Sequence, residues 1–175
     1  MNNEKDNVYD LVEDFYAHDE GWNTLLRQEY AEGFLRMEAW KGKKNSDLYR
    51  SWDNLTMLCL YLGSAETFLG DMNADDFIDC IAWCGRNISE FTPDYKNTQD
   101  FLETCDGLFK YLKGKNAISN DTVPATAAEI LLQEGKMNII LPDGSFDEAN
   151  AERAWNATPD IPCLLYTSDA ADDTP

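Results

Sequence analysis

Histidine is nearly absent from this sequence, because its 175 residues include only His18. A catalytic centre built on a serine or cysteine nucleophile needs a positioned base, and histidine is the usual one. His18 lies in an acidic segment at the end of the first predicted helix, and the sequence shows no apolar pocket around it. We therefore predict that His18 is a surface residue and that the chain is not an enzyme.

Other functional signatures are missing as well. No run approaches the ~18 consecutive apolar residues of a membrane span, and no glycine-rich phosphate loop follows a predicted strand. Carboxylates are abundant, but none forms a recognisable acid–base pair. The first residues lack the apolar segment of a secretory signal. These absences predict a cytoplasmic protein with no cofactor, no small-molecule ligand and no membrane partner.

Basic residues are scarce, since 14 Lys and Arg stand against 33 Asp and Glu and give a net charge of −19. On average, such a chain repels nucleic acid and anionic membranes. One stretch departs from this average, because residues 41–45 contain Lys41, Lys43 and Lys44 and no acid. This stretch is either a solvated linker or a contact for a phosphate backbone.

The cysteines show no pattern typical of a disulfide framework or a zinc site. Apart from Cys163, they occupy apolar positions of helical patterns, at Cys59, Cys80, Cys84 and Cys105. Such positions are typical of small core hydrophobes in a reducing compartment. A four-thiolate metal site is conceivable, but zinc ligands usually pair on turns that wrap around the ion. We predict four core cysteines and no metal.

Residues Cys163–Asp173, CLLYTSDAADD, are similar to one translated frame of the transposon-end adapter used in sequencing libraries. A segment of this kind is excluded from fold reasoning. We expect the natural sequence to stop near Pro162. Without Asp169, Asp172 and Asp173, the chain has 30 acidic residues and a net charge of −16.

Apolar residues recur at helical spacing through most of the chain, which predicts an all-α fold. The predicted helices cover residues 8–16, 22–37, 46–63, 74–85, 93–114 and 125–133. Ser46, Asn73 and Thr92–Pro93 are expected helix starts, and Gly63 and Gly114 are expected ends. The predicted core consists of Trp52, Leu55, Leu58, Phe77, Ile81, Phe101, Leu108, Phe109 and Leu112.

The chain divides into four predicted regions. Residues 1–45 form an N-terminal helical extension with a basic linker, and residues 46–121 form a helical domain. Residues 122–162 begin a following region, in which 137–146 reads as a small β-hairpin around Pro142–Gly144. Residues 163–175 contain the adapter-like segment.

Residues 46–121 resemble, in layout, the N-terminal core-binding domain of tyrosine recombinases and phage integrases. The parallel runs from Ser46 through Trp52 to Leu62, continues through an acidic step at 69–78, and ends with the segment 98–121. The resemblance implies a SAM-like helical bundle, here with two extra N-terminal helices and a small C-terminal hairpin. In that family this domain clamps DNA, and the catalytic residues lie in a later domain. The stretch 46–119 carries a net charge of −6.

We therefore predict a non-catalytic, core-binding-like module of a truncated recombinase-related protein, which binds duplex DNA weakly. The expected phosphate contacts are lysines, which position a duplex rather than specify its sequence. They are Lys41, Lys43, Lys44, Lys96, Lys110 and Lys113. Two alternatives stay open, namely an acidic interaction module for a basic protein partner and an acidic DNA mimic that does not bind DNA.

Overall fold

The computed structural model describes residues 7–134 and Met137. In this part of the chain every regular element is helical, so the all-α prediction is confirmed there. The elements are α1 (Val8–His18), η2 (Glu20–Thr24), α2 (Gln28–Trp40), α3 (Asn45–Ala65), η3 (Leu69–Asp71), α4 (Ala74–Asn87), α5 (Tyr95–Gly114) and α6 (Val123–Gln133). Apart from Met137, the predicted hairpin lies outside the described residues, as does the adapter-like segment.

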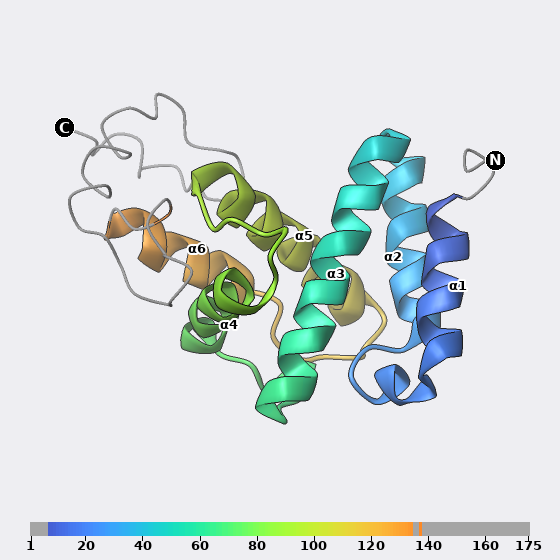
Figure 1. The fold of residues 1–175 in the computed structure, drawn as a ribbon, viewed down its shortest axis with the longest axis horizontal. Coiled ribbons are helices and arrows are strands. Elements are labelled where there is room, and N and C mark those ends of the chain that lie inside the picture. Colours follow the sequence, from blue (N-terminus) through green and yellow to red (C-terminus); the bar gives the residue numbers. More distant parts are fainter. Residues whose placement is uncertain (1–6, 135–136, 138–175) are drawn as a thin grey trace.

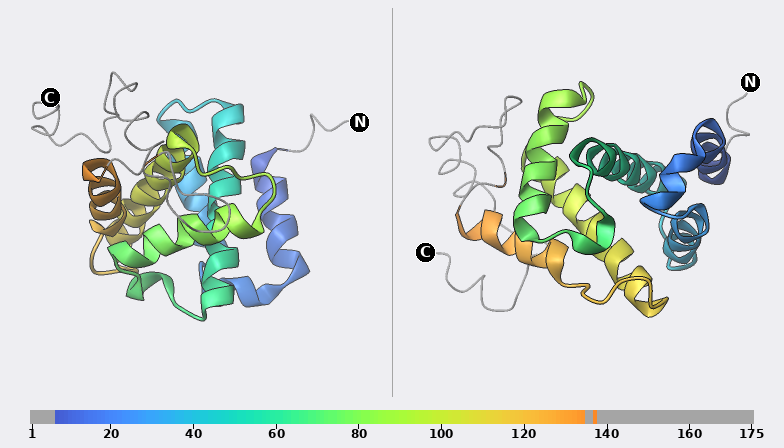
Figure 2. Two further views of the ribbon diagram at one scale, coloured as in Figure 1. Left: turned by 60° about the vertical axis from the view of Figure 1, so that its left-hand side comes forward. Right: turned by 90° about the horizontal axis from the view of Figure 1, so that it is seen from below.

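The long helix α3 lies between two groups of helices (Figures 1 and 2). On one side α1 and α2 pack against each other and against α3. On the other side α4 and α6 contact each other, and α5 contacts α2, α3 and α6. Because α3 and α5 each contact helices of both groups, they join the two halves.

A single apolar core runs through both groups of helices. It extends without a break from Val8 and Val12 on α1 to Leu131 and Leu132 on α6. All nine predicted core residues are buried, with at most 4% of any of them exposed. Helix-on-helix packing of these apolar faces therefore holds the fold together.

Asparagine side chains cap the N-termini of α1 and α4. Asn73 caps α4 as predicted, because its Oδ1 accepts the Asp76 backbone N–H at 2.9 Å while Asp76 accepts the Asn73 N–H at 2.9 Å. The same reciprocal capping box joins Asn7 and Asp10 at the start of α1. Each box satisfies backbone donors that a helix N-terminus otherwise leaves without partners.

Three predicted boundaries are wrong. Helix α3 begins at Asn45 instead of being capped by Ser46, and it passes through Gly63 to end at Ala65, where Glu66 adopts a left-handed φ of 54°. Gly63 packs beside η2, where a Cβ would make ordinary van der Waals contact with the Trp22 ring at 3.6 Å. The third wrong boundary is Thr92–Pro93, because α5 begins at Tyr95.

Helix α5 is capped by Asp94, whose carboxylate accepts the Asn97 N–H at 2.8 Å. The expected start at Thr92–Pro93 is wrong because Pro93 packs against α4 instead. A Cβ on Gly85 would lie 2.9 Å from the Pro93 Cγ. The single helix predicted over 22–37 is also wrong, because the chain turns at Leu25–Arg27 between η2 and α2.

Candidate functional site

The turn between α2 and α3 contains three of the predicted lysine sites. We call residues 40–44 the lysine turn. Lys41, Lys43 and Lys44 are all exposed, and Trp40 is 88% exposed at the end of α2. Gly42 reverses the chain with a φ of 105°, a conformation that favours glycine. The turn therefore presents an uncovered indole ring beside three cations.

Only one ammonium group of the lysine turn is paired within the described residues. Lys43 Nζ lies 3.1 Å from a Glu38 carboxylate oxygen, whereas Lys41 and Lys44 form no ion pair with any described residue. Lys44 also precedes α3, whose N-terminus has no side-chain cap. Backbone N–H groups at such a terminus favour an anion.

Helix α5 brings a fourth lysine near the turn. Glu38, the partner of Lys43, packs against α5, since a Cβ on Gly107 would lie 3.8 Å from its Oε2. Lys110 lies three residues further along α5, and its ammonium pairs with Asp106 at 2.7 Å. Lys43 and Lys110 therefore flank the contact between α2 and α5.

The remaining two lysine sites lie further from this contact. Lys113 is exposed in the last turn of α5. Lys96 is exposed in the first turn, and a rise of 1.5 Å per residue places it roughly 25 Å from Lys113 along the helix. The six predicted contacts therefore do not form one cluster.

The exposure of Trp40 was not predicted from the sequence. Its position three residues after Met37 continues the apolar spacing of α2. Helix α2 ends at Trp40, however, so no element packs over the ring. The available signal was the polar stretch that follows it, with Gly42 and three lysines.

A groove lies between α3, the loop after α4 and the start of α5, with a volume of about 460 Å³. We call it the α3–α5 groove. Its lining consists of Arg50, Asp53, Asn54, Thr56, Met57, Leu60, Ile88, Glu90, Phe91, Asn97 and Asp100. The sequence did not predict it, because residues 50–60 meet residues 88–100 only once α3 has packed against α5 and the loop before it.

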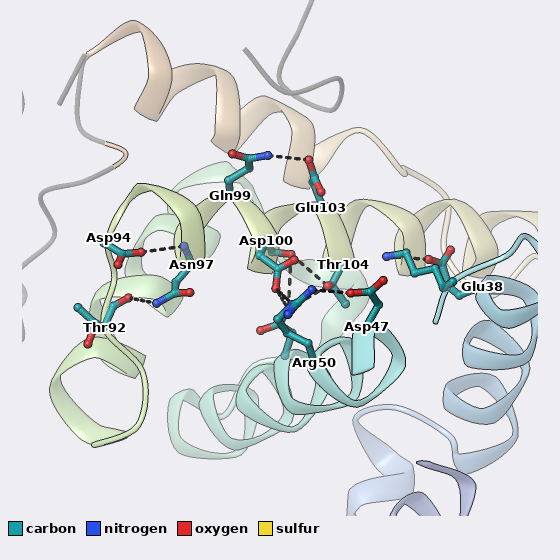
Figure 3. Close-up of polar contacts among 12 residues, drawn as sticks. Glu38, Asp47, Arg50, Thr92, Asp94, Asn97, Gln99, Asp100, Glu103 and Thr104 are labelled. Atoms are coloured by element: carbon teal, nitrogen blue, oxygen red, sulfur yellow. Dashed lines mark hydrogen bonds and ion pairs between the residues drawn. The ribbon is translucent and has the colours of Figure 1, made fainter. Parts of the chain in front are cut away.

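A polar network closes the end of this groove nearest the start of α3 (Figure 3). Arg50 bridges Asp47 at 2.6 Å and Asp100 at 3.2 Å. The buried Asn54 amide donates to the Thr104 hydroxyl at 2.9 Å and to an Asp100 carboxylate oxygen at 3.2 Å. These bonds fix α3 against α5 and hold the Arg50 guanidinium in place.

Two carboxylates of the groove form no ion pair with any described residue. They are Asp53 on α3 and Glu90 in the loop after α4. Partial burial raises the pKa of Asp53 above its ordinary value, because desolvation disfavours the charged form. At neutral pH the groove therefore has an excess of negative charge.

Chemistry based on histidine or thiols finds no support in the described residues. His18 is exposed at the end of α1, as predicted. All four predicted core cysteines are buried and free. Burial raises the pKa of Cys59 to about 12 and the pKa values of Cys80 and Cys105 above the ordinary thiol value. Within residues 7–134, no group of three or more metal-ligating side chains is assembled.

Comparisons with known proteins add no relative to this description. No protein-family model, curated protein or solved structure matches the chain. Among the helices of the described part, none is both long and apolar enough to cross a bilayer.

Proposed function

We propose that this chain is a non-catalytic helical module that binds duplex DNA weakly through the lysine turn. The observation that carries the proposal is the exposure of Lys41, Lys43 and Lys44 beside Trp40, on a turn with no acidic residue of its own. Lysine ammonium groups bind phosphates by releasing condensed counterions, and this binding does not depend on base sequence. The resemblance of residues 46–121 to recombinase core-binding domains supports the same function.

The geometry limits which of the lysines act together. Lys41 and Lys44 are available without breaking an ion pair, and Lys43 and Lys110 are held beside the contact between α2 and α5. Lys113 extends this surface along α5, whereas Lys96 lies at the other end of the helix. We therefore assign the phosphate contacts to the lysine turn first and to Lys110 and Lys113 second.

A salt titration tests this function. Anisotropy of a fluorescent duplex, measured from about 50 to 200 mM salt, gives the dependence of log K on log salt, with a slope near −0.9 per phosphate contact. Replacing Lys41, Lys43 and Lys44 together with alanine should flatten that slope by up to about three units. Lys96→Ala is the matched control and should leave the slope almost unchanged.

Two results would contradict the proposal. The first is no binding by the unaltered chain at tens of micromolar protein and about 50 mM salt, where even non-specific binders associate. The second is a change of the salt slope by Lys96→Ala that is as large as the change per lysine in the triple variant. Binding would then depend on overall charge and not on the lysine turn.

A second candidate function, an acidic module for a basic protein partner, is favoured by a different feature. The α3–α5 groove combines an apolar lining with carboxylates that no described cation neutralises. None of its lining residues belongs to the lysine turn, so it can be tested independently of DNA binding.

A further inference from the structure

The α3–α5 groove has an apolar wall with one exposed leucine. Leu60 is 39% exposed, and the buried side chains of Met57 and Phe91 lie behind it. Met57 and Leu60 belong to the same face of α3 as Asp53, because they follow it by four and seven residues. An apolar group that entered the groove would therefore contact both α3 and the loop before α5.

The charges around this wall are unbalanced. Three carboxylates, from Asp53, Glu90 and Asp100, face one guanidinium, from Arg50. Arg50 is already bound to Asp47 and Asp100. Asp53 and Glu90 consequently offer two negative charges to an incoming cation. Because Asp53 is partly desolvated, a cation beside it would replace solvation that the fold has removed.

The dimensions of the groove fit a short stretch of polypeptide. From Arg50 to Leu60 its wall extends roughly 15 Å along α3, at 1.5 Å per residue. An extended chain at about 3.3 Å per residue would place four to five residues along that wall. The volume of about 460 Å³ lies within the usual range for ligand sites, on the order of 300–1,000 Å³.

We propose that the α3–α5 groove binds a short basic segment of a partner protein. One apolar side chain of that segment packs against Met57, Leu60 and Phe91, and lysine or arginine side chains lie beside Asp53 and Glu90. A phosphate backbone does not fit, because two carboxylates would repel it. A second copy of this chain does not fit either, because its net charge of −19 repels a like molecule.

An NMR titration of the full chain tests this assignment. The probe is the acetylated and amidated pentapeptide Lys-Leu-Arg-Leu-Lys, added to the ¹⁵N-labelled protein. We expect amide shift changes centred on Asp53, Leu60 and Glu90. The double change Asp53→Asn with Glu90→Gln should weaken binding by roughly threefold or more, because both charge pairs are lost. Leu60→Ser should weaken it through loss of the apolar contact.

Matched controls separate the groove from the acidic surface as a whole. Glu13→Gln with Glu20→Gln removes two exposed carboxylates from α1 and η2, and Phe68→Ser removes an exposed apolar ring outside the groove. Both control proteins should bind the peptide as the unaltered chain does. Replacing Lys41, Lys43 and Lys44 with alanine should also leave peptide binding intact, so this proposal and DNA binding can fail separately.

Several outcomes would overturn the proposal. They are the absence of shifts at millimolar peptide, shifts spread over the whole surface, and equal weakening by the control changes. Equal binding of a peptide with serine in place of both leucines would show plain charge attraction. Equal shifts with a simple amine such as butylamine would show a small-cation site instead of a peptide site.

Discussion

At the scale of single residues, one buried hydroxyl joins the first helix to the turn before the second. Tyr16 is 2% exposed, and its hydroxyl donates to the Leu26 carbonyl at 2.6 Å. Burial raises the pKa of this phenol well above its ordinary value, so the group stays a neutral donor. Neutral buried hydrogen bonds of this kind have a large effect when one partner is removed.

Tyr16→Phe should lower the free energy of unfolding by about 1–2 kcal/mol, because it leaves the Leu26 carbonyl buried without this donor. Urea denaturation followed by circular dichroism measures the change. Tyr30→Phe is the control, since no described residue bonds the Tyr30 hydroxyl. A destabilisation as large in the control as in Tyr16→Phe would contradict this explanation.

Asp53 makes stability depend on pH in the direction opposite to a paired carboxylate. Burial raises its folded-state pKa above the ordinary 3.8, so the folded state holds more protons than the unfolded state in the window between the two pKa values. Stability therefore falls as pH rises through that window. Above it, the unfavourable charge is fully present.

Asp53→Asn should accordingly stabilise the protein at pH 7, and the gain should disappear as pH falls below about 4. Urea midpoints of both proteins between pH 3.5 and 8 give the comparison. Glu13→Gln, on the exposed face of α1, should show no such gain. A variant less stable than the unaltered chain at pH 7 would mean that the Asp53 charge has a favourable partner.

At the scale of elements, the sequence predicted the helices better than their ends. Apolar spacing located the helical segments, because a buried stripe on a helix recurs every three to four residues. The ends depend on single side chains instead. Asn73 was predicted because asparagine before two aspartates is a strong local signal, whereas Asp94 was missed because Pro93 packs on Gly85 of α4. A contact between separate helices cannot be read from spacing.

The α4 capping box predicts an energetic difference between two asparagines. Asn73→Ala should lower stability by about 1 kcal/mol, because the Asp76 N–H loses its acceptor. Asn45→Ala is the matched control, since Asn45 is the exposed first residue of α3 and caps nothing. It should change stability by less than about 0.5 kcal/mol. Thermal unfolding of both variants compares them, and equal effects would contradict the assignment of the cap.

At the scale of the whole molecule, the core joins helices that the sequence analysis had divided between regions. The core residues of 46–121 were predicted correctly. Their contact with a wider core that includes Val12 and Leu131 was not predicted. The spacing of apolar residues shows which face of a helix is buried, but it does not show which helix packs against that face. The groove was missed for the same reason, since Leu60, Phe91 and Asp100 meet only after α3, α4 and α5 have packed. The exposed lysines were named from the sequence, but the distance between Lys96 and Lys113 at the two ends of α5 was not considered.

Leu108 lies at the centre of this core and tests its packing. It is fully buried on α5, the helix that contacts α2, α3 and α6. Leu108→Ala should lower the free energy of unfolding by roughly 2–5 kcal/mol, through lost burial and the cavity that remains. Leu60→Ala, which truncates a partly exposed leucine, should have a clearly smaller effect in the same urea experiment. A loss below about 0.5 kcal/mol for Leu108→Ala would contradict helix-on-helix packing.

The four core thiols also allow transient opening of the helical core to be measured without an added label. Each is at most 1% exposed, and they come from α3, α4 and α5. An alkylating reagent modifies the thiolate, so each can react only when the surrounding helices separate. In a Cys163→Ser background, mass spectrometry after alkylation should show four modifications or none if the core opens as one unit. Early modification of Cys80 and Cys84 alone would instead identify α4 as a helix that detaches while the others stay packed.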